Sequence, residues 1–154
     1  MSRTASPTGC GASEMRSSQL AADYVHRAEV RVRALAVLFA GESWADVVRE
    51  SQEIVELALK ALLRACGIEP PRIHDVSDVL VAERTRLPAA LAAEVDALAE
   101  ASRRLRRDRE LAFYGAEDLT PSGFYSRHDA EEAKAWAERT VALVAPHVPR
   151  VSGP

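Results

Sequence analysis

Apolar and small residues follow their most regular pattern across residues 42–67, ESWADVVRESQEIVELALKALLRACG. They recur at steps of three and four residues, which is the spacing of one face of an α-helix. The members of this stripe are Trp44, Val47, Val48, Ser51, Ile54, Val55, Ala58, Ala61 and Leu62. The pattern predicts a helix with one buried side, against which the rest of the chain packs.

Both ends of this stretch carry signals that limit the helix. Ser43 with Asp46 three residues later resembles a capping box, with Asp in place of the usual Glu. Gly67 supplies a stop at the C-terminal end, and the following pair Pro70 and Pro71 prevents any continuation.

The same spacing predicts four further helices, over residues 18–40, 75–83, 88–111 or beyond, and 127–146. Their starts are signalled by Asp75 as a cap, by Pro88 at a favoured first position, and by Ser126 with Asp129 as a second capping box. Three of them carry a predicted buried side. Its members are Leu20, Tyr24, Ala28, Leu35 and Leu38 in the first helix, Leu91, Val95, Leu98, Ser102 and Leu105 in the third, and Ala130, Ala133, Ala137, Val141 and Val144 in the last.

The two ends of the chain lack this pattern. Residues 1–16 and 148–154 are small, polar or interrupted by Pro and Gly, so we expect disordered tails around one helical domain over residues 17–147. No segment has the pattern of a strand, and Ala and Leu dominate the composition. The sequence therefore predicts an all-α fold.

Composition and charge exclude several classes of protein. The 154 residues are 47% hydrophobic and 28% charged, with a formal net charge of −3, which is typical of a globular domain. No apolar run reaches the ~18 residues that span a bilayer, and the N-terminus lacks the apolar segment of a secretory signal, so a cytoplasmic protein is expected. No spacing fits a zinc site, and we expect neither metal nor cofactor.

His74 stands alone before the short helix, a position more typical of packing and hydrogen bonding than of a ligand.

The predicted helix over residues 88–111 or beyond becomes rich in arginine towards its end. Residues 103–109 contain five arginines. At about 100° per residue, Arg103, Arg107 and Tyr114 fall on the side opposite the buried stripe. Guanidinium groups bind phosphate and stack on aromatic rings, so this side is a candidate surface for RNA or a nucleotide. The alternative is a subunit interface in which the arginines pair with an acidic set on the core helix, formed by Glu50, Glu53 and Glu56.

Two runs of the chain resemble the HEPN domain family. IVELALKALLRACGIEPPRIHDVSDVL resembles that family's signature of an amphipathic helix, a Gly-Ile-Glu-Pro-Pro-type loop, His-Asp and a short helix. RRDRELAFYG, then Pro121, Tyr125 and a closing alanine-rich helix, resembles its second half. The resemblance covers about residues 20–145 and implies an up-and-down antiparallel bundle of four to five helices, usually dimeric.

The family's catalytic motif is incomplete in this chain. Many HEPN proteins are metal-independent ribonucleases with an Arg-x(4-6)-His motif and a polar residue after the Arg. The toxin branch has Arg-x4-His-x-Tyr, and a small nucleotidyltransferase partner can neutralise it by adenylylating the Tyr. Here Arg107, the polar Asp108 and Tyr114 fit the motif, but Ala112 occupies the His position. Alanine transfers no proton, so we expect no efficient ribonuclease.

Three functional hypotheses follow. The first is a non-catalytic, dimeric module that binds a nucleotide, RNA or a partner through Arg103, Arg107, Asp108, Arg109 and Tyr114, beside a separate nucleotidyltransferase that could modify Tyr114. The second is a ribonuclease toxin of a toxin–antitoxin pair in which His74 or Tyr114 replaces the missing acid–base group. The third is a purely structural helical dimer.

Overall fold

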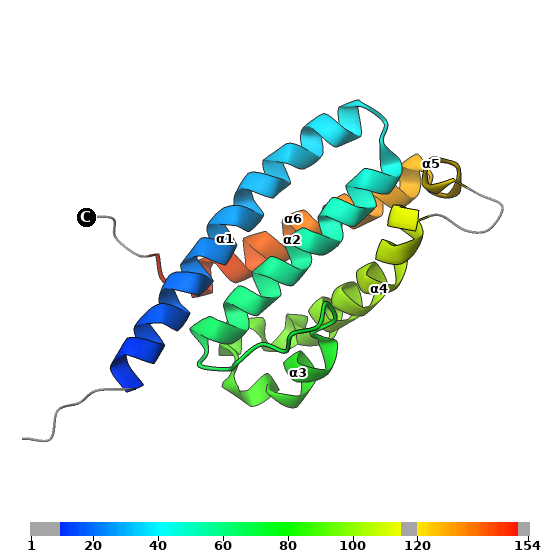
Figure 1. Ribbon diagram of the computed structural model, residues 1–154. Coiled ribbons are helices and arrows are strands. Elements are labelled where there is room, and N and C mark those ends of the chain that lie inside the picture. Colours follow the sequence, from blue (N-terminus) through cyan, green and yellow to red (C-terminus); the bar gives the residue numbers. More distant parts are fainter. Residues whose placement is uncertain (1–9, 115–119, 151–154) are drawn as a thin grey trace, which may run out of the picture.

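The computed structural model describes residues 10–114 and 120–150, and the side chains of residues 13–106 and 120–150 (Figure 1). Its α-helices are α1 (Cys10–Ala40), α2 (Trp44–Ala65), α3 (Ser77–Ala82), α4 (Val95–Tyr114), α5 (Pro121–Phe124) and α6 (Arg127–Val144). Short 3₁₀ turns occupy Arg84–Arg86, Ala89–Glu94 and Ala145–His147. The described chain contains no strand, so the fold is all-α as predicted.

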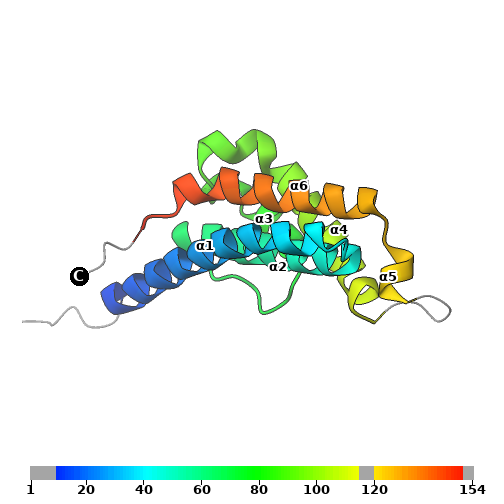
Figure 2. The ribbon, with the colours of Figure 1, turned by 90° about the horizontal axis from the view of Figure 1, so that it is seen from above.

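Four main helices pack antiparallel, and α2 lies at their centre. It packs against α1, α4 and α6. Figures 1 and 2 show α1 and α4 on either side of α2, with α6 in a second layer behind them. The short α3 packs on α4 and closes the end of the bundle where α2 finishes. No helix in the described ranges is long and apolar enough to cross a membrane.

The predicted stripe of α2 is confirmed, because eight of its nine members are buried and Trp44 is partly buried. The C-terminal signal is also confirmed, since Gly67 has φ +74° and Ile68 N–H donates to the carbonyl of Leu63 at 2.9 Å. The predicted capping box at Ser43 and Asp46 is not confirmed. Ser43 is the N-cap residue, but its hydroxyl donates to the Asp46 carboxylate at 2.5 Å and accepts no backbone N–H.

Helix α1 starts at Cys10, so the predicted start at residue 18 was wrong and the helix enters the segment predicted as a tail. Its first turns contain the good helix formers Ala12, Glu14, Met15 and Arg16, which favour continuation of the helix. Ala28 and Leu35 are fully buried as predicted. Leu20 is exposed instead, in a shallow groove that Arg64 and Gly67 at the end of α2 also line.

Helix α4 differs from its prediction at the start and agrees at the end. Pro88 precedes a 3₁₀ turn, Ala89–Glu94, and the α-helix begins only at Val95. It then continues without a break to Tyr114. Its predicted buried stripe from Leu91 to Leu105 is confirmed in full.

Helix α6 starts as predicted, whereas α3 starts at Ser77 with Val76, and not Asp75, as its N-cap residue. Asp75 accepts from Ser77 N–H at 2.9 Å at the start of α3, and Ser126 with Asp129 forms both halves of a capping box on α6. Past α6, Val148 is buried and Arg150 pairs with Glu29 of α1, so the ordered chain continues beyond residue 147. Residues 1–9 and 151–154 lie outside the described chain, and the domain boundaries at 17 and 147 stay a prediction.

Leu59 tests the central role of α2, because its side chain is completely buried. We expect Leu59→Ala to lower the free energy of unfolding by about 2–5 kcal/mol, through lost apolar burial and the cavity left behind. Urea unfolding followed by circular dichroism measures this change. Val81→Ala on the exposed side of α3 is the control, with an expected change within about 0.5 kcal/mol. Equal losses of unfolding free energy in Leu59→Ala and Val81→Ala would contradict the central position of α2.

Candidate functional site

The arginine segment, residues 103–109, lies on the C-terminal half of α4, and its first members have different roles. Arg103 is exposed and forms a loose ion pair with Glu100 of the same helix, at 3.5 Å. Arg104 points to α6 and pairs with Glu132 at 2.5 Å. Arg104 therefore helps to hold α4 against α6, whereas Arg103 faces outwards and can meet a ligand.

The other predicted site residues, Arg107, Asp108, Arg109 and Tyr114, have side chains outside the described part of the structure. Their backbone belongs to α4, which supplies the unbroken helix that the prediction required. In this register Arg107 lies one turn beyond Arg103 on the same face, and Tyr114 lies two turns further. The shared helix face is established, and the contacts of these four side chains stay a prediction.

Two members of the predicted acidic set on α2, Glu50 and Glu56, have partners within the chain. Glu50 pairs with Arg31 of α1 at 3.0 Å. Glu56 pairs with Lys60 and with His74. The alternative pairs these carboxylates with the arginine segment across a subunit interface, which contacts within one chain do not test, so it stays a prediction.

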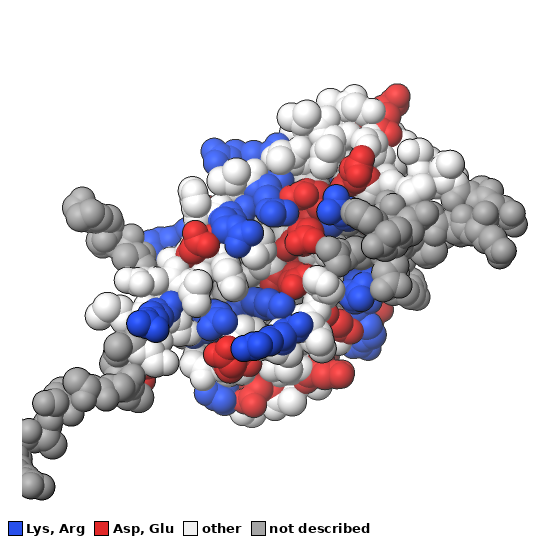
Figure 3. All heavy atoms as spheres, viewed as in Figure 1, with Lys and Arg blue, Asp and Glu red and all other residues white. Residues whose placement is uncertain are grey.

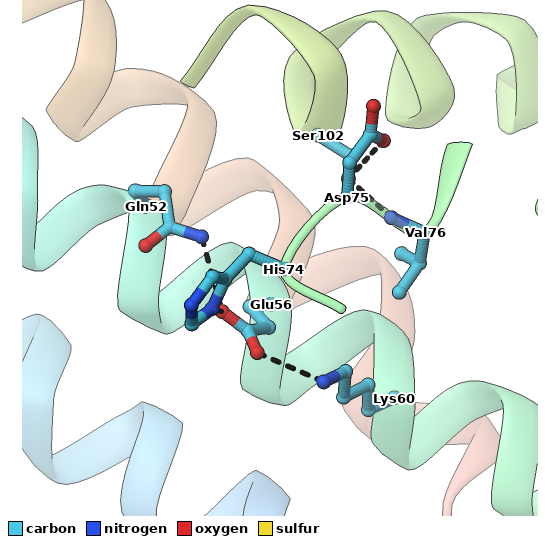
Figure 4. Close-up of polar contacts among 7 residues, drawn as sticks. All are labelled: Gln52, Glu56, Lys60, His74, Asp75, Val76 and Ser102. Carbon is cyan, nitrogen blue, oxygen red and sulfur yellow. Dashed lines mark hydrogen bonds and ion pairs between the residues drawn. The ribbon is translucent and has the colours of Figure 1, made fainter. Parts of the chain in front are cut away.

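Figure 4 shows a polar cluster that the sequence did not reveal. Gln52, Glu56 and Lys60 lie at four-residue steps along one side of α2, and the loop after α2 places His74 against them. His74 Nδ1 lies 2.8 Å from the Glu56 carboxylate, which also accepts from Lys60 at 2.9 Å and from Gln52 at 3.1 Å. Only 13% of the Glu56 side chain is exposed, whereas 40% of His74 is exposed.

The Glu56 carboxylate stays ionised despite its burial. Loss of water around the group raises its pKa, but hydrogen bonds from Lys60, His74 and Gln52 lower it, and the net pKa is below the ordinary value of 4.5. A charged, half-buried carboxylate that holds one ring nitrogen fixes the orientation of the imidazole. The His74 ring is thus held in a defined direction with a large part of its surface still in solvent.

The same loop is attached to α4. Ser102, buried on α4, accepts from Val76 N–H at 3.1 Å and donates to the Asp75 carboxylate at 3.3 Å (Figure 4). Ser102 directly precedes the arginine segment, so the loop joins the Glu56–His74 pair to the base of that segment. The four-residue spacing of Glu56 and Lys60 is visible in the sequence, but no local spacing reveals a contact across 18 residues of chain.

A small cavity lies between α2, α4 and α6. Its volume is about 30 Å³, and its lining includes Val48, Arg104, Tyr125 and Trp136. This volume holds one or two water molecules and excludes a nucleotide. This cavity is therefore not the site of a ligand of that size. Figure 3 shows basic and acidic side chains interspersed over the face viewed there, so that face offers no uniformly basic surface.

The HEPN domain profile matches residues 21–147 of this chain. The chain belongs to the HEPN domain family. Searches of curated proteins and of solved structures gave no match. The family assignment agrees with the antiparallel bundle and accounts for nearly all of the described helices.

This HEPN domain keeps Arg107, Asp108 and Tyr114 of the toxin motif and has Ala112 where that motif has His. His74, the histidine that the sequence offered as an alternative proton-transfer group, lies on the loop that Asp75 and Val76 join to Ser102 of α4. His128 is exposed on α6, where its ring lies 3.9 Å from Glu132. Within the described residues, no group of three or more His, Cys, Asp or Glu side chains could hold a metal ion.

Replacement of Glu56 tests the polar cluster. We expect Glu56→Gln to lower the free energy of unfolding by roughly 1–3 kcal/mol near neutral pH, because Lys60 and His74 lose their shared anion. A carboxyl with a lowered pKa stabilises the fold above its ordinary pKa of 4.5, and this contribution is lost as the pH falls through its folded-state pKa. The difference from the native protein should therefore shrink below pH 4.5.

Urea titrations across this pH range measure the effect. Glu69→Gln is the matched control, because Glu69 is largely exposed and its ion pair with Arg64 spans 3.5 Å. If the difference in unfolding free energy between Glu56→Gln and the native protein does not change with pH, the role of the ionised carboxylate is contradicted.

Proposed function

We propose that this HEPN protein is a non-catalytic, dimeric module that binds RNA or a nucleotide through the arginine segment of α4. The observation that carries the proposal is the unbroken course of α4 to Tyr114 with Arg103 exposed on its outer face. Along that face the register adds Arg107 and Tyr114. Guanidinium groups contact phosphate, and an aromatic ring stacks on a base, so the three residues suit a phosphate-bearing ligand.

The absence of a motif histidine supports the non-catalytic part of the proposal. Cleavage of RNA without a metal requires proton transfer at the 2′-hydroxyl and at the leaving oxygen. Ala112 supplies neither transfer, and an unperturbed Tyr has a pKa near ~10, which is poorly matched to neutral pH. The retained Arg107 and Tyr114 can still bind.

A separate nucleotidyltransferase is the proposed partner protein. The family resemblance implies it, and the described residues contain no strand, so they do not themselves form such an enzyme. Tyr114 at the C-terminal end of α4 is the proposed site of adenylylation. The added nucleotide would introduce a phosphate beside the arginines, where it would compete with RNA.

Binding of labelled single-stranded RNA and of ATP tests the module, with each ligand titrated separately. We expect Arg107→Ala to weaken binding roughly tenfold, since one charge-assisted contact to phosphate is lost. For RNA, the slope of log K against log salt should fall by about 0.7 in magnitude, the value for one phosphate contact on a single strand. Arg103→Ala should act in the same direction.

Arg139→Ala is the control, because Arg139 is an exposed arginine of α6 that pairs with Glu94. It should leave both affinities and the salt slope unchanged. Binding of neither ligand by the native protein, together with a dimeric mass, would favour a purely structural helical dimer. Equal binding by Arg107→Ala and the native protein would remove the arginine segment as the site.

A second candidate function is a ribonuclease toxin that uses His74 as its acid–base group. The observation that favours it is the 2.8 Å contact between His74 Nδ1 and the buried Glu56 carboxylate. A carboxylate that orients an imidazole is a recurrent arrangement in general acid–base catalysis. The bonds of the loop to Ser102 keep this pair attached to the helix that carries the arginines.

Cleavage of RNA in EDTA tests this candidate. A ribonuclease of this kind should lose about 10²–10⁴-fold in rate on His74→Ala, the usual contribution of a general acid or base. His128→Ala should retain full activity, since that histidine is exposed on another helix. Expression of the native protein should also arrest growth. No cleavage and no growth arrest would eliminate the candidate and leave the binding module.

A further inference from the structure

Helix α5 lies beside the C-terminal end of α4, the helix that carries the arginine segment. It packs against α4 and α2, and Figures 1 and 2 both place it next to the last turns of α4. Thr120, the N-cap residue of α5, follows Tyr114 by six positions, so the chain between them spans at most about 22 Å. A ligand bound along the end of α4 therefore comes close to a side chain exposed on α5.

Helix α5 exposes an aromatic ring. Phe124 is 41% exposed. All other aromatic side chains that the structure describes are buried or partly buried, namely Tyr24, Phe39, Trp44, Tyr125 and Trp136. A single exposed apolar residue is common on protein surfaces, so its exposure alone indicates no role. An exposed ring beside an arginine-rich helix is a more specific combination.

The short turn of α5 holds the backbone of Phe124 in place. The Thr120 hydroxyl accepts from Gly123 N–H at 3.1 Å. The Thr120 carbonyl accepts from Phe124 N–H, also at 3.1 Å. The position of Phe124 is thus set before a ligand arrives, which lowers the entropy cost of binding.

The next residue, Tyr125, anchors this turn to the core and leaves the Phe124 ring outside. Tyr125 is buried and lines the small cavity together with Arg104 and Leu105 of α4. The ring centroids of Phe124 and Tyr125 are 5.0 Å apart, and their planes cross at 74°. In such an edge-to-face contact, Tyr125 covers at most one face of the Phe124 ring. The exposed part of Phe124 therefore offers aromatic surface to a partner from solvent.

The chemistry of this corner fits an unpaired nucleobase. Every base has a flat π-face that stacks on an aromatic side chain, while cations beside it contact the phosphates. Phe124 supplies the aromatic surface, and the arginine segment supplies the cations. A duplex keeps its bases stacked on one another and offers none to such a ring.

We infer that Phe124 is a platform on which single-stranded RNA, bound along α4, stacks a base. The inference rests on the RNA-binding function proposed above and deepens it. It adds a binding residue that lies outside the Arg-x4-His-x-Tyr motif, and it selects single-stranded RNA over duplex RNA.

Three labelled ligands, each titrated into the full chain, test the platform. They are a single-stranded RNA, an abasic oligonucleotide with the same ribose-phosphate backbone, and a duplex of the same sequence. We expect the native protein to bind the single strand most tightly, because only this ligand combines phosphates with unpaired bases.

The variant F124L separates stacking from apolar contact, since leucine is apolar and has no aromatic face. We expect F124L and F124A to weaken binding of the single-stranded RNA about tenfold and to leave binding of the abasic oligonucleotide unchanged. The slope of log K against log salt should stay at its native value, because no phosphate contact is lost. F124W keeps an aromatic face and should bind the single strand at least as tightly as the native protein.

Two further variants are the controls. Val81→Ala removes a side chain of similar exposure, 43%, from α3 at the other end of the bundle, and should leave all three affinities unchanged. Arg107→Ala should show the opposite pattern to F124L. It should weaken the single strand and the abasic oligonucleotide alike and lower the salt slope.

The outcomes separate the platform from the proposed RNA-binding function. If the native protein binds none of the three ligands, both are overturned. If Arg107→Ala weakens RNA binding but F124L and F124A bind like the native protein, the platform is overturned and the arginine segment remains the site.

Equal losses for the single strand and the abasic oligonucleotide in F124L would mean that Phe124 acts through the packing of α5, which also overturns the platform. Equal binding of duplex and single strand by the native protein overturns the selection of single strands. Circular dichroism of every variant checks that the fold is retained. If F124A does not fold, F124L and F124W still decide the question.

Discussion

The burial of α2 is the constraint on which the rest of the structure depends. Three helices, α1, α4 and α6, pack against it, so most of its circumference is committed to the core. A helix enclosed in this way can keep polar side chains only along a narrow strip. That strip contains Gln52, Glu56 and Lys60, and the loop after α2 covers it with His74. The position of the loop therefore follows from the need to satisfy a carboxylate that packing has left half-buried.

The loop in turn joins two helices whose relative position matters for the proposed site. Its attachment to α2 is ionic, through Glu56 and His74. Its attachment to α4 consists of hydrogen bonds to Ser102 from the backbone of Val76 and to the Asp75 carboxylate. On the far side of α4, Arg104 reaches Glu132 of α6. The base of the arginine segment is thus held from two sides, and a rigid base keeps the outer face of α4 in one orientation.

The sequence predicted those parts of the fold that local periodicity determines. The stripes of α2, α4 and α6 were confirmed because each depends only on which face of a helix is apolar. The predicted start of α1 was wrong. Nearby Gly and Pro residues suggested a tail, but the helix formers after Cys10 continue the helix. The cap at Ser43 failed for a related reason. Its hydroxyl has two acceptable partners within one turn, and the sequence does not say which one it takes.

The candidate site was less predictable, because it depends on contacts between distant segments. The pair Glu56 and His74 is separated by 18 positions, and only the path of the Gly67–Pro70–Pro71 loop brings the two side chains together. The sequence also did not predict that neighbouring arginines of α4 have different roles. Arg103 and Arg104 are neighbours in sequence, yet 100° of helical rotation sends one to solvent and the other to α6.

The helical register of α4 is compatible with the proposed binding face in the absence of the motif histidine. Position 112 lies about 140° around the helix from Arg107, on a different flank, whereas Tyr114 lies within about 20° of it. A histidine at position 112 would therefore not share the face formed by Arg103, Arg107 and Tyr114. Its replacement by Ala112 removes a proton-transfer group and leaves that face intact. The proposed binding residues and the histidine position of the motif lie on separate flanks of α4, so the absence of that histidine does not require the loss of the proposed binding face.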